Sequence, residues 1–247
     1  VLSGVAPAQA AFRAVDPATS LTWQLRDGDR LGPGDIVATL TGPSRAILTG
    51  ERTALNLLGH LSGIATRTAG LVALVDGTGA RIIDTRKTTS GLRSLEKDAV
   101  VHGGGANHRF GLYDAILVKD NNIALGGGLS AVLERLSARA GHLTPVEIEV
   151  DTLEQLEVVL AFDADRIAAG QRPVVTAVLL DNMSPELVAQ GVARVRRHPS
   201  PVVVEVSGGV TEATVRALAE AGPDVISLGA LTHSVRCLDL GLDHHPQ

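Results

Sequence analysis

Six short runs of β-branched and aliphatic residues alternate with helix-like stretches from residue 81 onward, and this alternation limits the possible folds more than any other feature. The expected strands are residues 81–85, 115–119, 146–150, 174–181, 202–206 and 224–228. Apolar residues at helical spacing follow four of them, at 129–136, 153–160, 185–192 and 213–218. Near-continuous apolar strands separated by helices are typical of a parallel sheet covered by helices. The pattern predicts an α/β fold.

A polar residue or a glycine stands at the end of each run. These residues are Arg86, Lys119, Glu149, Asp181, Ser207 and Gly229. A (β/α) barrel builds its active site at the C-terminal ends of its strands. The number of units and these strand ends together predict a (β/α) barrel-like domain, an incomplete TIM-type barrel, with an open doubly wound sheet as the alternative.

Two helix starts can be predicted from local sequence. Asp151 followed by Glu154 resembles a capping box, and Ser184-Pro185 places a cap before a first-turn proline. We therefore expect helices to begin next to these residues.

Residues 1–52 have a different pattern, because glycines and prolines separate short strands such as the one expected at 36–40. We expect a small N-terminal α/β lobe at 1–52, a barrel catalytic domain at 53–235, and a tail at 236–247 that returns to the lobe. A long apolar helical pattern covers 53–70. The chain begins with Val1, and we expect the lobe to be truncated at its start.

Charge and composition exclude several classes of protein. Asp and Glu number 27 against 22 Lys and Arg, which gives a net charge of −5, and aromatic residues make up 2%. A chain without a basic surface or stacking rings is not expected to bind nucleic acid or an anionic membrane. Since we see no signal peptide and no apolar stretch of about 20 residues, we expect a cytoplasmic protein. Cys237 is the single cysteine, and we expect it to be buried and inert.

Cationic side chains form four clusters: Arg52, Arg86-Lys87, His108-Arg109 and Lys119. The last three lie at or near the ends of apolar or glycine-rich runs. One such cluster is usually a solvated surface charge, but repetition at strand ends of an acidic protein predicts a pocket for an anion.

Two further groups of strand-end residues point to a phosphorylated sugar. Ser207-Gly208-Gly209 ends one strand and Gly229 the next, where small residues let backbone N–H groups approach a phosphate. Glu149 and Asp181 end two neighbouring strands. Carboxylates facing an anion pocket need a hard cation such as Mg²⁺ between them and the ligand, or sugar hydroxyls to hold.

Nine short segments spread along the chain can be compared with known sequence motifs. In order, they are Glu51-Arg-Thr-Ala-Leu-Asn, Leu61-Ser-Gly-Ile-Ala-Thr, Asp84-Thr-Arg-Lys-Thr, Gly103-Gly-Gly-Ala-Asn-His-Arg, Lys119-Asp-Asn, Glu147-Ile-Glu-Val, Leu180-Asp-Asn-Met, Ser207-Gly-Gly and Gly229-Ala-Leu-Thr-His. In this order they resemble motifs of the quinolinate phosphoribosyltransferase family, and the resemblance covers nearly the whole chain. The resemblance implies transfer of a phosphoribosyl group from phosphoribosyl pyrophosphate to quinolinate, with decarboxylation, to give nicotinate mononucleotide in NAD biosynthesis. It also implies Mg²⁺ as cofactor, and we expect a homodimer with shared active sites, or a higher oligomer.

The resemblance also implies a role for each matched residue. The residues that would hold the two carboxylates of quinolinate are Arg86, His108, Arg109, Lys119 and, from a neighbouring subunit, Arg52. The residues that would cradle the 5′-phosphate are Ser207, Gly208, Gly209 and Gly229, supported by His233. Lys87 would meet the carboxylates or the pyrophosphate, and Thr85 would be a further substrate-binding residue. Glu149 and Asp181 would serve the ribose and Mg²⁺, so the predicted catalytic set is Lys87, Lys119, Glu149 and Asp181.

Three positions depart from the family pattern: Ser90 in place of proline, Asp98 in place of tyrosine and Asn122 in place of histidine. Two alternatives remain open. One is a related phosphoribosyltransferase acting on nicotinate or another heterocyclic acid, and the other is a non-catalytic ligand-binding paralogue.

Overall fold

The computed structural model describes residues 1–244 in two compact units. One unit comprises Val1–Val72, Lys87–Asn107 and the chain from Gly229 onward, and the other comprises Ala73–Arg86 and His108–Leu228. The domain boundary expected after residue 52 falls inside helix α2 (Ser44–Leu74), and the predicted boundaries stay predictions. Residues 245–247 of the predicted tail lie outside the described residues.

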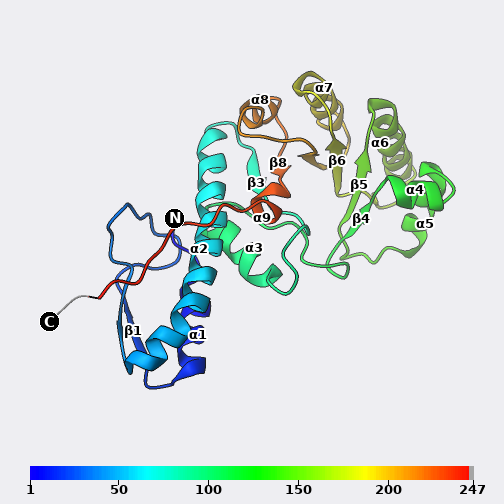
Figure 1. The fold of residues 1–247 in the computed structure, drawn as a ribbon. Helices are drawn as coiled ribbons and strands as arrows, with labels where there is room; N and C mark the ends of the chain where they lie inside the picture. The colour runs from blue at the N-terminus through cyan, green and yellow to red at the C-terminus, as the bar shows by residue number, and fades with distance from the viewer. Residues whose placement is uncertain (245–247) are drawn as a thin grey trace. The chain divides into compact units, whose positions relative to one another are not determined.

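The second unit is built on a parallel six-stranded sheet, shown in Figure 1. Its strands are β3 (Arg81–Ile83), β4 (Ile116–Val118), β5 (Val146–Val150), β6 (Ala177–Asp181), β7 (Val203–Ser207) and β8 (Val225–Ser227). All six overlap the runs predicted from the sequence.

The strand order β3-β8-β7-β6-β5-β4 distinguishes the two folds considered above. Consecutive strands from β4 to β8 are neighbours, and the last strand then pairs with the first. An open doubly wound sheet instead reverses its strand order at a switch point. Among the described strands, the pairing between β3 and β4 is absent, so the sheet is a barrel with one open seam. The predicted incomplete (β/α) barrel is confirmed.

Helices cover the outer face of this sheet. They are α4 (Asp120–Leu125), α5 (Leu129–Arg139), α6 (Leu153–Ala168), α7 (Pro185–Val195) and α8 (Val215–Glu220). Side chains alternate between the two faces of a strand, and the outward set of buried aliphatics includes Ile148, Leu180 and Val204. Helix α7 approaches closely because Gly191 has no side chain; a Cβ there would lie 2.9 Å from Cδ1 of Leu180.

The inner face carries the polar residues of the same strands. Because paired residues of parallel strands project to the same side, the register places Glu149, Leu179 and Glu205 in one row across β5, β6 and β7. Asp181 and Ser207 are paired one step further toward the C-terminal strand ends. The alternation of apolar and acidic residues in these strands therefore produces both the core and a polar interior.

Of the two predicted helix starts, one is confirmed and the other is off by a residue. Ser184 caps α7 by accepting a hydrogen bond from the Leu187 N–H at 3.4 Å, and Pro185 is the first helical residue. The cap of α6 is Thr152, not Asp151, because the Thr152 hydroxyl accepts from Gln155 N–H at 3.2 Å. The Gln155 side chain in turn accepts from Asp151 N–H at 2.7 Å, so Gln155 replaces Glu154 as the reciprocal partner.

The first unit contains a two-stranded antiparallel sheet and its helices. The elements are α1 (Val5–Val15), β1 (Ser20–Trp23), β2 (Ala38–Thr41), α2, α3 (Arg93–His102) and α9 (Ala230–His233). Its core is formed by Leu2, Ala8, Phe12, Ala54 and Leu58. This small antiparallel sheet with its helices confirms the predicted α/β character of the N-terminal part.

The segment after α9 lies along α2. Leu238 N–H donates to the Gly59 carbonyl at 2.9 Å, and Leu240 packs against the core of the first unit. A Cβ on Gly63 would lie 2.3 Å from the Arg236 carbonyl oxygen, so this close approach depends on glycine. Cys237 is exposed, which corrects the prediction that it is buried. It follows Arg236 on a segment whose backbone carbonyls at Arg236 and Leu238 lie closest to the helix.

Helix α2 also corrects one expectation about membranes. Its 31 residues are long and apolar enough, by length and composition, to cross a membrane, although no such segment was expected. Half of the apolar window is buried in the structure, which is the pattern of a core helix.

Candidate active site

A half-buried arginine pair, Arg86 and Arg109, forms the first part of the candidate site in the second unit. Arg109 donates from Nη1 to the Ala115 carbonyl at 2.9 Å, while its Nε is buried with no hydrogen-bond partner within residues 1–244. Burial and the nearby charge of Arg86 lower the pKa of Arg109. Two neighbouring guanidinium groups that repel each other are suited to bind an anion with more than one negative charge.

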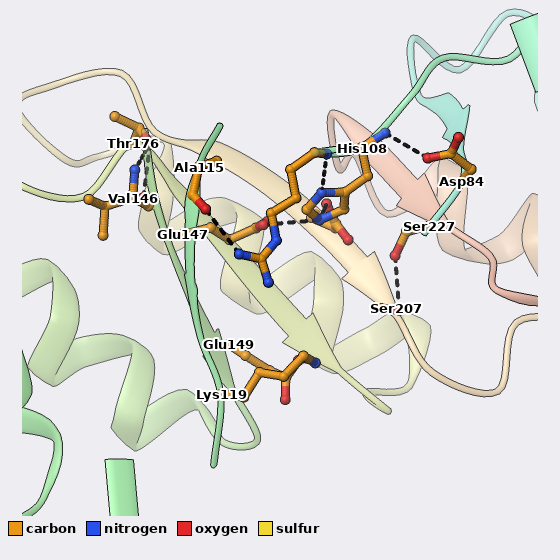
Figure 2. Close-up of polar contacts among 12 residues, drawn as sticks. Asp84, His108, Ala115, Lys119, Val146, Glu147, Glu149, Thr176, Ser207 and Ser227 are labelled. Carbon is orange, nitrogen blue, oxygen red and sulfur yellow. Dashed lines mark hydrogen bonds and ion pairs between the residues drawn. The ribbon is translucent and has the colours of Figure 1, made fainter. Parts of the chain in front are cut away.

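His108 is fixed by contacts of its backbone N–H and of both ring nitrogens, as Figure 2 shows. Its backbone N–H donates to Oδ1 of the buried Asp84 at 2.8 Å. Its Nδ1 accepts from the Arg109 N–H at 2.6 Å, which places the proton of the neutral ring on Nε2. Nε2 lies 3.2 Å from Oε2 of Glu147 and 3.5 Å from Oε2 of Glu205.

Burial disfavours the charged form of His108, but its hydrogen bond to Glu147 and the charge of Glu205 outweigh this and raise its pKa. Burial, reinforced by repulsion from Glu147, raises the pKa of Glu205 to about 8. His108 and Glu205 therefore hold their protons to a higher pH than an exposed histidine and an exposed glutamate would.

Glu147 and Glu205 are residues that sequence reasoning missed. Glu147 was part of a recognised motif but was given no role, and Glu205 was treated as part of an apolar strand. The available signal was alternation, since Glu147 lies two residues before Glu149 and Glu205 two before Ser207, so each shares a face with its predicted neighbour.

Lys119 and Glu149 form an ion pair at the strand ends, and Figure 2 labels the two residues next to each other. Burial raises the pKa of Glu149; Lys119 opposes this, and the nearby carboxylates of Asp181 and Asp120 add to it. Lys119, Glu149 and Asp181 thus lie close together. Two close carboxylates beside one ammonium form a set of hard oxygen donors that a divalent cation fits.

Asn122, one of the three departures from the family pattern, has a clear local function. Its side-chain oxygen accepts from Lys119 N–H at 2.9 Å and closes the first turn of α4. The residue therefore positions the backbone of Lys119 at the end of β4.

The Ser207-Gly208-Gly209 turn is tightly packed against the loop after β6. Gly208 and Gly209 have φ angles of 86° and 61°, which favour glycine, and a Cβ on Gly208 would lie 2.2 Å from Oδ1 of Asn182. Asn182 donates from Nδ2 to Asp181 at 2.5 Å, and the Ser227 hydroxyl donates to that of Ser207 at 2.9 Å. These contacts link the predicted phosphate turn to the predicted metal carboxylate.

We predict that Gly208→Ala is much more destabilising than Gly170→Ala. Both glycines have positive φ, but a Cβ on Gly170 would meet nothing within 4 Å. The difference in unfolding free energy should be roughly 1–3 kcal/mol, the usual cost of overpacking, measured by urea unfolding. Equal losses in the two variants would contradict the tight contact with Asn182.

Of the remaining predicted site residues, Thr85 lies in the second unit, and Lys87, Gly229, His233 and Arg52 belong to the first. A Cβ on Gly229 would lie 2.8 Å from Cδ of Lys87 and 3.1 Å from Cδ2 of His233, so these three residues lie together. The Thr232 hydroxyl donates to the Lys87 carbonyl at 2.7 Å and fixes this arrangement. Arg52 is exposed on α2.

Comparison with known proteins gives a consistent result over the whole chain. The family described as "Quinolinate phosphoribosyl transferase, C-terminal domain" matches residues 64–243, and "Quinolinate phosphoribosyl transferase, N-terminal domain" matches residues 1–62. The chain is 41% identical over 243 residues to the probable nicotinate-nucleotide pyrophosphorylase [carboxylating] of Bacillus subtilis (strain 168), covering 98% of this chain and 79% of that protein. It is 44% identical over 221 residues to the nicotinate-nucleotide pyrophosphorylase [carboxylating] of Mycobacterium leprae, covering 90% and 74%.

A solved structure agrees. The crystal structure of nicotinate-nucleotide pyrophosphorylase from Ehrlichia chaffeensis superposes with a TM-score of 0.89 at 34% identity, covering 98% of this chain and 83% of that one. The likeness extends through both units, so the comparison concerns the whole described chain.

Proposed function

Because the chain belongs to the quinolinate phosphoribosyl transferase family, we propose that it transfers a phosphoribosyl group from phosphoribosyl pyrophosphate to the ring nitrogen of quinolinate. The products are nicotinate mononucleotide, CO2 and pyrophosphate. The observation that supports this best is the closeness of the half-buried Arg109 to Arg86 beside an otherwise acidic interior. A dicarboxylate matches two neighbouring guanidinium groups in charge and geometry.

The roles of the carboxylates follow from the charge that develops at the sugar. The anomeric carbon becomes cationic as pyrophosphate leaves, so nearby anions lower the barrier. Glu149 and Asp181 lie close enough for Asp181 to raise the pKa of Glu149, and both project from the inner face of the sheet. We assign these two carboxylates to the ribose and to Mg²⁺, directly or through water. When bound, Mg²⁺ would neutralise charge on the pyrophosphate.

Decarboxylation needs no nucleophile from the protein. Once it carries the ribose, the ring nitrogen is cationic and stabilises the electron pair left on C2 when CO2 departs, and C2 then takes up a proton. The protein must hold the carboxylates and exclude water, which increases the strength of each charge contact. Arg86, His108 and Arg109 perform this positioning in our proposal, with Lys119 released from Glu149 to join them.

The phosphate of the sugar is assigned to the turn formed by Ser207, Gly208 and Gly209. Left-handed glycines turn successive N–H groups in one direction, and such a nest binds anions. Lys87, Gly229 and His233 lie together in the first unit, and we assign the pyrophosphate or 5′-phosphate to them as well. Thr85, directly before Arg86, stays a predicted substrate contact.

A nicotinate-specific enzyme is the weaker alternative. A monocarboxylate would leave part of the Arg86, His108 and Arg109 charge without a counterion in a partly buried pocket, which is costly. The direct test is to incubate purified protein with phosphoribosyl pyrophosphate, Mg²⁺ and either quinolinate or nicotinate, and to follow nicotinate mononucleotide and CO2. Product with CO2 from quinolinate alone supports the proposal, whereas turnover of nicotinate without CO2 would contradict it.

We further propose a homodimer in which Arg52 reaches the active site of the partner subunit. Arg52 is exposed on α2, not on a strand end of its own barrel, so it is better placed to serve another pocket. If Arg52 only capped a helix or formed a surface salt bridge, replacing it with alanine would leave activity nearly unchanged.

Mixing two inactive variants tests this arrangement. Arg52→Ala and Lys119→Ala proteins are combined under conditions that allow subunit exchange. A mixed dimer would carry both defects in one pocket and neither in the other, so activity should recover to about a quarter of wild type in an equal mixture. Lack of recovery despite verified exchange would show that Arg52 acts within its own subunit or not at all.

A further inference from the structure

The acidic pair under His108 is not needed by the chemistry described above. Glu205 lies in the middle of β7 with a side chain that is 4% exposed, and Glu147 lies on the inner face of β5 with 11% exposed. Oε1 of Glu205 is buried with no hydrogen-bond partner within residues 1–244. An ionised carboxylate with an unsolvated oxygen is expensive, and a second carboxylate nearby adds to the cost.

The groups that face Glu205 leave few ways to relieve this cost. Glu147 comes from β5, His108 from the segment before β4, and Ser227 from β8, while the paired residue on β6 is Leu179. Of these, only His108 offers positive charge. Its Nδ1 already accepts the Arg109 N–H at 2.6 Å, so a second ring proton would have to break that bond.

We propose that Glu205 keeps a proton at neutral pH, and that this proton keeps the His108–Arg109 pocket cationic enough to bind a dianionic acceptor. Only the second half of this inference, which concerns the acceptor, rests on the proposed function. Protonated Glu205 adds no negative charge beside His108, whereas ionised Glu205 adds one at 3.5 Å from Nε2. Loss of the proton would therefore cancel the positive charge that attracts the acceptor. Glu205 is thus a positioning residue that acts through His108.

A metal ion is the competing explanation, because one ligand atom from each of His108, Glu147 and Glu205 lies within 4.8 Å of the others. A metal at Nε2 requires that nitrogen to lose its proton. With Nδ1 accepting from Arg109 N–H, the ring would then carry no proton at all. A proton on Glu205 satisfies the same geometry without that penalty.

The first experiment uses the free protein, so it does not depend on the proposed activity. Glu205→Gln imitates the protonated carboxyl, and Glu134→Gln, an exposed change on α5, is the control. A buried acid with a raised folded pKa contributes stability that is fully present below the unfolded pKa and is lost as pH rises through the folded pKa. The melting temperature of Glu205→Gln relative to wild type should therefore rise from pH 5 to pH 8, approximately the pKa of Glu205. The control should follow wild type.

Infrared spectra of wild type alone provide a second measurement in case the variant fails to fold. The carbonyl stretch of a protonated carboxylic acid should be present at neutral pH and should disappear as the pH passes about 8. Its absence at neutral pH, or a melting-temperature difference that does not change with pH, would show that Glu205 is ionised and would overturn the proposal. If wild type bound one equivalent of Zn²⁺ and Glu205→Gln bound none, the proposal would be overturned and the cluster would be a metal site.

The link to the acceptor is tested by titrating quinolinate calorimetrically. Above the Glu205 pKa, wild type must take up a proton when it binds quinolinate, so its Kd for quinolinate should rise about tenfold per pH unit. The measured heat of binding should then depend on the ionisation enthalpy of the buffer that supplies the proton. Glu205→Gln should lack both effects while binding quinolinate at pH 7 much as wild type does. The same pH slope in both proteins would overturn the link. If wild type bound no quinolinate at any pH, the proposed function would fail, whereas the free-protein results would still decide the protonation.

Discussion

Replacing Arg109 with alanine should weaken quinolinate binding by roughly 2–5 kcal/mol, or about 30- to 5,000-fold, the cost of truncating one partner of a buried charge pair. The large value is expected because Arg109 is held by the Ala115 carbonyl and has a buried Nε without a partner in the described chain. Its guanidinium is thus already oriented and partly desolvated before the acceptor arrives. Calorimetric titration of quinolinate at pH 7 measures the change directly.

A matched control separates this effect from a general change of charge. Arg139 is exposed at the end of α5, and Arg139→Ala removes the same charge from the same unit. It should leave quinolinate affinity within about twofold of wild type, because exposed charges are screened. Wild-type affinity in Arg109→Ala would show that the arginine pair does not form the acceptor pocket.

Much of the barrel could be predicted because buried strands and helices impose different periods on the sequence. Val146–Val150 is buried at every position, and its β-branched residues alternate with Glu147 and Glu149 at the period of a strand. The helix after it shows apolar residues at helical spacing. Exact element ends were harder to predict. Asp151 and Thr152 are both good caps, and the choice depends on which oxygen reaches the Gln155 N–H, a matter of backbone geometry.

The site was predicted in part, for a related reason. Charged residues at strand ends are visible in the sequence because they interrupt apolar runs, which is how Lys119 and Asp181 were found. Glu205 lies inside such a run, and its meaning depends on the register that brings β5, β6 and β7 side by side. Its contact with His108 joins residues almost a hundred positions apart in the chain. Sequence spacing alone does not carry that information.

The other large effect is expected at Asp181, where Asp181→Asn should lower kcat by about 10²–10³, the usual loss when one group that stabilises developing charge is removed. The substitution keeps the shape of the side chain and removes its charge. Asp181 repels Glu149 and accepts from Asn182 at 2.5 Å, so its carboxylate is held at the strand end beside the phosphate turn. In our proposal it serves the sugar and Mg²⁺, not the pyridine.

Kinetics with varied Mg²⁺ and varied quinolinate distinguish the two roles. We expect a lower kcat and a higher Mg²⁺ requirement in Asp181→Asn, with the quinolinate KM little changed. Asp165→Asn, an exposed change on α6, is the control for loss of one carboxylate and should match wild type. An unchanged kcat with a raised quinolinate KM would reverse the assignment, because an interaction lost equally in ground and transition states changes KM alone. Asp181 would then face the acceptor, and the arginine pair would have to bind the sugar phosphate instead.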